Sequence, residues 1–166
     1  MKMAFKSRHK KMTTIILVMG TVVLLSSYLI YQAHRVKEQN KLREQLQANI
    51  SNQISLFKNG DTPTVDLSKT TSFSWDRLYI FGPYVPLDII QERLGYAWEP
   101  DTSLELGFDT PFSLLVFTLD GEVSQYIEYP SELANFSEAG EKVEGYKPEE
   151  AKFEMNDFGY IIWIKN

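Results

Sequence analysis

Cysteine is absent from the 166 residues of this chain, and histidine occurs only twice, at His9 and His34. Without cysteine the protein has no disulfide, no thiolate zinc site, no cysteine nucleophile and no lipid-modified N-terminal cysteine. Both histidines lie in the first quarter of the sequence, so a Ser–His catalytic pair is excluded from the remainder. No G-x-S-x-G motif occurs either. These absences favour a protein that is not an enzyme and carries no cofactor.

Charged residues are missing from Met12 to Ala33, a run of 22 positions. As a helix, its most apolar part, Thr13–Tyr31, would extend about 28 Å, close to the roughly 30 Å thickness of a bilayer core. The run therefore predicts a transmembrane helix over 13–31. A cleaved signal peptide is the alternative, but the run is longer than a typical signal sequence, and Tyr31-Gln32-Ala33 makes a poor cleavage site.

Basic residues flank the apolar run, with five Lys or Arg before it and four in the stretch after it. The positive-inside rule then predicts a cytoplasmic N-terminus and an extracytoplasmic C-terminal domain, and hence a single-pass protein of the cell membrane with the lipid bilayer as a partner. The expected organisation is a basic segment (1–12), a transmembrane helix (13–31), a helical stalk (32–60) and an acidic domain (61–166).

The charge of the chain changes sign near residue 60. Residues 1–59 carry a net charge of +8, whereas residues 60–166 carry −13. A domain this acidic repels a polyphosphate backbone, so nucleic-acid binding by the C-terminal part is excluded.

A helical pattern fills the stalk, since Leu42, Leu46, Ile50 and Ile54 recur every four residues. The segment Asn59–Pro63 provides a stop, with Gly60 as a C-terminal cap. One interpretation is that this apolar stripe packs on its own domain. The other is that it binds a partner or a second copy, although the stripe does not follow a strict heptad repeat.

The C-terminal domain shows short strand-like runs that are rich in aromatic residues. A strand is expected over Phe73–Phe81 and a short helix over Pro86–Leu94. Two hairpins are expected, over 111–129 around Asp120-Gly121 and over 151–165. The pattern predicts an α+β domain with a mainly antiparallel sheet of about five strands, covered on one side by a short helix.

Asp76 is the most notable acidic residue, because it lies within the expected strand between Trp75 and Arg77. If the side chain faced inward, desolvation would raise its pKa, and it would be a candidate acid for a carboxylate-dependent hydrolase. The alternative, which base rates favour, is that Asp76 caps or pairs locally, for instance with Arg77 or Arg93.

Three acids, Asp101, Glu105 and Asp109, recur every four residues in the middle of the domain. A hard cation such as Ca²⁺ requires several oxygen ligands, but no EF-hand pattern is present. Gly107 and the flanking Pro100 also disfavour a helix that would align the three carboxylates. A solvated acidic loop is the better interpretation, and no metal site is predicted.

Aromatic residues are the remaining candidates for binding, since 18 of the 22 in the chain lie in residues 60–166. Most should form the core, but a few near the short helix lie in expected loops, where binding residues gather. The predicted binding surface consists of Tyr84, Pro86, Tyr96 and Trp98. Beside acids and amides, exposed rings of this kind could stack on sugars.

The segment Trp75-Asp76-x-x-Tyr79-x-Phe81-x-Pro83-Tyr84 resembles a segment of small membrane-anchored or lipid-anchored extracytoplasmic proteins of Gram-positive bacteria. The likeness covers about a tenth of the chain and rests on about six residues. It implies an outward-facing bacterial domain but no activity, and this chain lacks the cysteine of the lipid-anchored members.

The function expected from the sequence is a single-pass membrane protein that presents a non-catalytic domain for binding a protein partner or an envelope polymer. One alternative is an envelope hydrolase that uses carboxylates. A second is a structural subunit of a membrane complex that acts through its transmembrane and stalk helices.

Overall fold

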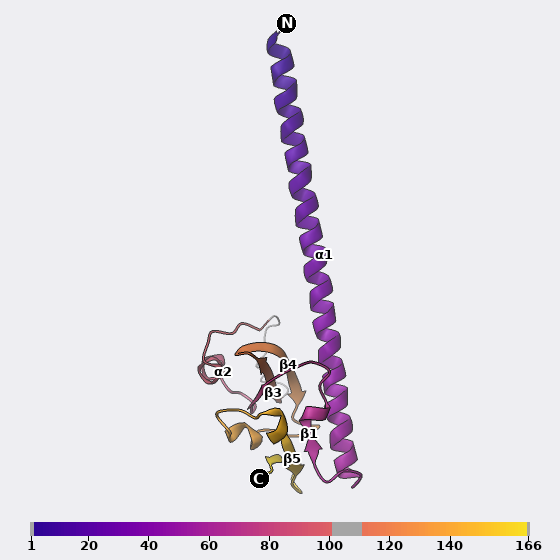
Figure 1. Ribbon diagram of the computed structural model, residues 1–166, viewed down its shortest axis with the longest axis vertical. Helices are drawn as coiled ribbons and strands as arrows, with labels where there is room; N and C mark the ends of the chain where they lie inside the picture. The colour runs from indigo at the N-terminus through magenta and orange to yellow at the C-terminus, as the bar shows by residue number, and fades with distance from the viewer. Residues whose placement is uncertain (1, 101–110, 166) are drawn as a thin grey trace. The chain divides into compact units, whose positions relative to one another are not determined.

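The computed structural model describes the backbone of residues 2–100 and 111–165, and the side chains within those ranges from Val18 onward (Figure 1). The chain divides into two compact units, Met1–Lys41 and Leu42–Asn166. The helix α1 (Lys2–Lys58) begins in the first unit and ends in the second. All other described helices and strands belong to the second unit.

The first unit consists of α1 as far as Lys41. Its large hydrophobic side chains between Val18 and Tyr31 are exposed. The hydroxyl groups of Thr21, Ser26 and Ser27 donate hydrogen bonds to carbonyl oxygens three residues earlier in the same helix. Among the residues whose side chains are described, no helix has an apolar stretch long enough to cross a membrane.

This finding contradicts the transmembrane helix predicted over 13–31, and with it the prediction of a single-pass protein located in the cell membrane. Between Val18 and Tyr31, Gly20 and the hydroxyl residues Thr21, Ser26 and Ser27 interrupt the apolar side chains. A spanning helix needs about 20 predominantly apolar residues. The side chains of the predicted cytoplasmic segment, 1–12, lie outside the described residues.

The described part of the second unit contains six strands in two antiparallel sheets, one in the order β1–β5–β6 and the other in the order β2–β3–β4. The strands are β1 (Val65–Asp66), β2 (Arg77–Phe81), β3 (Phe112–Leu119), β4 (Glu122–Pro130), β5 (Lys152–Met155) and β6 (Ile161–Trp163). The described part of this unit also contains the helix α2 (Leu87–Leu94) and three short 3-10 helices, η1 (Leu67–Lys69), η2 (Ala139–Glu141) and η3 (Pro148–Glu150).

The predicted single sheet of about five strands with one short covering helix is wrong. The two predicted hairpins belong to different sheets, because β5 pairs with β1 and not with any strand of the β2–β3–β4 sheet. In addition, the strand expected over Phe73–Phe81 begins only at Arg77, and α1 also packs against the strands. Sheet membership depends on pairings between distant segments, such as Val65 with Phe153, which hydrophobic periodicity does not encode.

The pairing of β3 with β4 confirms the hairpin predicted over 111–129. Asp120 and Gly121 have φ angles of 53° and 82°, the positive values that a type I′ turn requires at both central positions. The pairing register shifts between Phe117 and Thr118, which indicates a bulge close to this turn. The second hairpin, β5–β6, is also present where the sequence placed it.

The β2–β3–β4 sheet is buried on both faces. In its central strand, Leu115 and Phe117 belong to one apolar cluster and Leu114 and Val116 to another, as the alternation of a strand requires. The main core includes Leu46, Ile50 and Ile54 of α1 together with residues of both sheets, and the second core includes Ile90 of α2, Phe81, Trp98 and Tyr126. The last turns of α1 and the helix α2 therefore lie on opposite sides of β3 (Figure 1).

The last turns of α1 belong structurally to the domain. Ile50 has no exposed surface, and the hydroxyl of Ser51 lies 3.0 Å from that of Tyr129 in β4. The apolar stripe thus packs on its own domain, which confirms the first of the two interpretations. The predicted stop is confirmed as well, since α1 ends at Lys58 and Gly60 has a φ of 79°.

Candidate functional site

The four residues predicted as a binding surface do not share one exposed patch. Tyr84 is 57% exposed and has a φ of 65°, and Pro86 is exposed beside it at the start of α2. Tyr96 is half-buried, and burial raises the pKa of its hydroxyl. Trp98 is only 8% exposed, so it forms part of the core and offers little surface to a partner.

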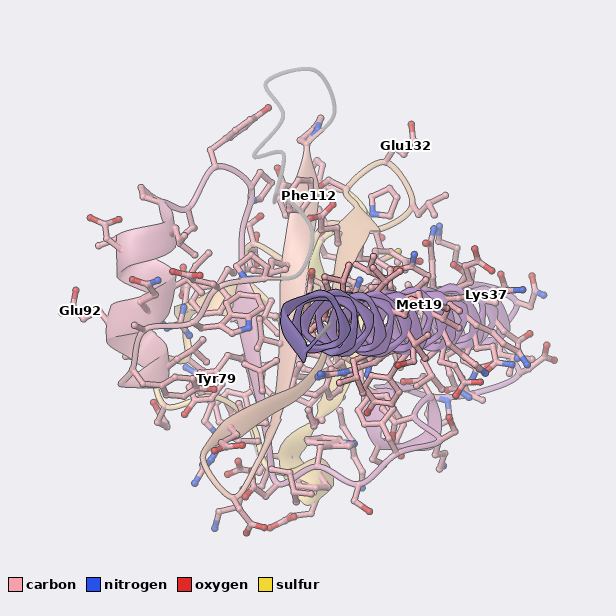
Figure 2. The ribbon with its side chains drawn as sticks, turned by 90° about the horizontal axis from the view of Figure 1, so that it is seen from above. Met19, Lys37, Tyr79, Glu92, Phe112 and Glu132 are labelled. Atoms are coloured by element: carbon pink, nitrogen blue, oxygen red, sulfur yellow. The ribbon has the colours of Figure 1, made fainter. Side chains whose placement is uncertain are left out.

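Trp98 is buried because it completes the second core. Its ring meets the ring of Tyr126 edge to face, with centroids 5.0 Å apart, and its carbonyl oxygen accepts a hydrogen bond from Gln91 of α2. An indole side chain has a large apolar surface, so its burial in this core is favourable even though Trp98 lies in a loop. Figure 2 shows Tyr79 on the same side of the sheet as α2, with Glu92 of that helix pointing away from the strands.

Asp76 is exposed, so the interpretation of an inward-facing acid is wrong. Its carboxylate accepts a hydrogen bond from the backbone N–H of Asp120 at 2.9 Å and another from the hydroxyl of Thr118 at 3.3 Å. The alternative of local pairing is therefore confirmed, although the partners are in the β3–β4 hairpin instead of being Arg77 or Arg93. Asp76 thus ties the hairpin turn to the start of β2.

An open groove lies next to Asp76 and has a volume of about 560 Å³. This space, called the β2 groove below, is lined by residues from three places in the chain. These residues are Trp75, Asp76, Arg77, Tyr79, Thr118, Gly121, Lys147, Pro148 and Glu149. Its volume falls within the roughly 300–1,000 Å³ range of small-molecule sites in proteins.

One side of the groove is held against β2 by a close approach of two backbone segments. Leu78 and Tyr146 exchange backbone hydrogen bonds of 2.8 Å in both directions. The approach requires glycine at position 145, which has a φ of 71°, because a Cβ there would lie only 2.8 Å from the carbonyl oxygen of Leu78. The same Cβ would lie 3.2 Å from atoms of Arg77 and Tyr79, so the missing side chain leaves room for both.

The segment that carries Lys147 and Glu149 is fixed by its neighbour Glu150. The Glu150 carboxylate accepts hydrogen bonds of 2.9 Å from the backbone N–H of Lys147 and from the ammonium group of Lys142. These two donors, the backbone N–H first, lower the pKa of Glu150. The indole N–H of Trp163 donates to the backbone carbonyl oxygen of Glu150. This side of the groove is therefore preformed.

Two cations of the groove are free to bind a ligand. In the described part of the chain, the side chains of Arg77 and Lys147 make no hydrogen bond and no ion pair. Two other cations of the domain are engaged, since Arg93 donates to three carbonyl oxygens and Lys142 pairs with Glu150. The groove also holds two carboxylates, so its formal charge is balanced within a region of net charge −13.

No metal site is evident in the described residues. Within them, no group of three or more His, Asp or Glu side chains is placed to hold a metal ion. Asp101, Glu105 and Asp109, the acids considered from the sequence, lie outside the described residues.

Sequence reasoning missed the β2 groove apart from Asp76. Arg77 and Lys147 are far apart in the chain, and the segment around Lys147 has no motif that would indicate a site. The only local signal is Gly145 within an otherwise acidic loop, since a glycine there permits a close backbone approach. No family profile, no curated protein and no solved structure matches this chain, so the resemblance based on the Trp75–Tyr84 segment stays a prediction.

Proposed function

We propose that residues 42–166 form a non-catalytic binding domain and that its ligand occupies the β2 groove. The observation that supports this best is a preformed groove in which the side chains of two cations make no hydrogen bond and no ion pair with the described residues. A cation that is not needed to stabilise the fold remains available to a ligand. In this respect Arg77 and Lys147 differ from Arg93, whose guanidinium is used within the domain.

The construction of the groove suits binding because little has to be ordered when a ligand arrives. The close approach at Gly145, the hydrogen bonds of Glu150 and the hairpin held by Asp76 each fix one part of its lining. Groups that are already positioned lose less conformational entropy on binding. The exposed pair Tyr84 and Pro86 remains a predicted second contact for a partner.

A carboxylate-dependent hydrolase is the second candidate, because Asp76 and Glu149 line the same groove. Glycoside hydrolysis uses two carboxyl groups, one of which must act as a general acid. In this chain Asp76 already accepts two hydrogen bonds from the hairpin, and both acids are exposed to solvent. The arrangement therefore favours binding over catalysis.

The proposed site can be tested without knowledge of the natural ligand. We would titrate the ¹⁵N-labelled full chain with phenol, acetamide, acetate and methyl glucoside, and follow the backbone amide signals by NMR. Small polar probes gather at sites that combine apolar surface with oriented polar groups. We expect the largest shifts at the amides of Trp75, Tyr79, Gly121 and Lys147.

The double variant Arg77→Ala/Lys147→Ala should reduce these shifts. Its matched control is Lys152→Ala/Lys165→Ala, which removes two exposed cations outside the groove. Probe shifts that cluster elsewhere, or that are the same in both double variants, would overturn the proposed site.

A further inference from the structure

We propose that the ligand of the β2 groove is a neutral saccharide segment. This inference rests on the proposed function and specifies the chemistry that the groove recognises. The charge of the groove, its hydrogen-bonding groups and the edge of β2 each narrow the class of ligand.

Charge disfavours an ionic ligand of either sign. The groove contains two cations, Arg77 and Lys147, and two carboxylates, Asp76 and Glu149, so their formal charges cancel. An anionic ligand would meet both carboxylates in a region of net charge −13, whereas a cationic ligand would meet the two free cations. Like charges brought close together lower affinity. A neutral ligand avoids both penalties.

The polar groups of the groove match hydroxyl groups. A hydroxyl donates one hydrogen bond and accepts others, so it can use donors and acceptors that lie side by side. Arg77 and Lys147 are donors only, while Glu149 and the remaining lone pairs of Asp76 are acceptors. Charge-assisted bonds of this kind are stronger than bonds between neutral groups. Adjacent hydroxyls of a sugar ring supply the matching pattern.

The groove also has apolar lining for the C–H faces of a sugar ring. Tyr79 is half-buried, so part of its ring remains accessible, and Pro148 lines the groove as well. Trp75 is 9% exposed and contributes little surface of its own, since its ring packs on Phe117 and its indole N–H donates to Thr71. Burial of apolar ligand surface against such side chains favours binding.

A peptide ligand that pairs with β2 as an added strand is disfavoured, because backbone groups at the outer edge of β2 already have hydrogen-bond partners. The backbone of Leu78 is already bonded in both directions to Tyr146, and the carbonyl oxygen of Ile80 accepts from Arg93. Addition of a strand depends on free backbone donors and acceptors. A saccharide needs only side-chain partners, which the groove offers.

The inference can be tested by NMR titration of the full chain with neutral tetrasaccharides, namely chitotetraose, cellotetraose and maltotetraose. The matched charged probes are the fully deacetylated form of chitotetraose, which is cationic, and tetragalacturonate, which is anionic. We expect at least one neutral tetramer to shift the amides of Tyr79, Gly121 and Lys147, and to bind at least fivefold more tightly than both charged probes.

Two exposed side chains make suitable variants, because their removal should leave the fold intact. Lys147→Ala and Glu149→Ala should each weaken binding at least fivefold, whereas the controls Lys152→Ala and Glu154→Ala, on exposed positions outside the groove, should not change it. The amide spectrum of each variant verifies that it is folded.

The outcomes separate this inference from the proposed function. If the small probes map to the groove but no neutral tetramer binds there, or a charged tetramer binds more tightly, the saccharide assignment is wrong and the binding site stands. If neither small probes nor tetramers shift the groove amides, both proposals are wrong. Equal effects of the groove variants and their controls would also overturn the saccharide assignment.

Discussion

Leu78 in β2 and Tyr146 in the loop before η3 exchange two backbone hydrogen bonds, each 2.8 Å long. This pair closes part of the outer edge of β2, and the guanidinium of Arg93 covers the carbonyl oxygen of Ile80 farther along the same edge. An exposed strand edge can pair with another chain, so such coverage protects the domain. It also brings Lys147 next to β2, where it lines the same groove as Arg77.

Gly145→Ala should therefore destabilise the domain and disturb the groove. Its φ of 71° lies in the left-handed region, where alanine costs about 1–2 kcal/mol. The added Cβ would also lie 2.8 Å from the carbonyl oxygen of Leu78, and relief of that overlap should cost roughly another 1–3 kcal/mol. The measurement is the free energy of unfolding from urea denaturation.

Gly159→Ala is the matched control for this prediction. Gly159 has a φ of 83°, but a Cβ there would meet nothing within 4 Å, so only the conformational cost applies. Equal losses of stability in the two variants would show that the approach between Gly145 and Leu78 is not as close as described.

The sequence predicted features that depend on local chemistry. The Asp120-Gly121 turn needs two positive φ angles, and the stop after Lys58 needs a residue that tolerates the left-handed region, as Gly60 does. The helix α2 likewise ends at Leu94 and is capped by Gly95, which has a φ of 84°. In each place one or two adjacent residues determine the conformation, so sequence alone is sufficient.

Features that depend on distant segments could not be predicted. The pairing of Val65 with Phe153 separates the strands into two sheets, and the approach of Gly145 to Leu78 creates the groove. The alternating pattern runs through Asp76 and predicts a strand interior there, but β2 begins one residue later. Its side chain therefore holds the hairpin turn, so the favoured interpretation of local pairing is correct and the buried-acid alternative is wrong.

Ile50→Ala should show that the last turns of α1 are part of the domain. Ile50 has no exposed surface and lies in the main core, so loss of its side chain should cost about 2–5 kcal/mol in free energy of unfolding. The control Asn52→Ala, at an exposed position in the same turn, should change stability by less than about 0.5 kcal/mol. A small effect of Ile50→Ala would contradict the packing of this helix on the sheets.

Arg93→Met should destabilise the domain through its backbone contacts. The guanidinium donates to the carbonyl oxygens of Ile80, Gly140 and Lys142 at 3.2, 3.0 and 2.8 Å, and burial lowers its pKa. Loss of these charge-assisted hydrogen bonds should cost on the order of 2–3 kcal/mol in free energy of unfolding. Arg93→Lys should retain only part of this stability, because a lysine ammonium lacks the planar guanidinium that reaches several acceptors at once.

Lys152→Met provides the comparison for Arg93→Met, since it removes an exposed cation and should leave the free energy of unfolding almost unchanged. Urea denaturation of the four proteins, including the wild type, gives the required differences. Full recovery of stability by Arg93→Lys would show that charge, and not the forked geometry, holds these carbonyl groups.

Glu150 should make the stability of the domain depend on acid pH. Its pKa in the folded protein is lowered, first by the hydrogen bond from the backbone N–H of Lys147 and then by that from Lys142. The unfolded chain therefore binds a proton at this position more readily than the folded protein does. The stabilisation is complete above the ordinary glutamate pKa of 4.5, and it is lost as the pH falls from there through the lower folded-state value.

Glu150→Gln removes this titration, so the stability difference between the wild type and the variant should be constant from pH 7 to pH 5.5 and should shrink as the pH falls toward 3. The measurement is urea denaturation across this range. Glu149→Gln, at the exposed neighbouring residue, corrects for the general effect of removing one negative charge from the acidic domain. A difference that stays constant down to pH 3, or grows, would show that the carboxylate of Glu150 does not hold Lys142 and the backbone of Lys147 in the folded protein.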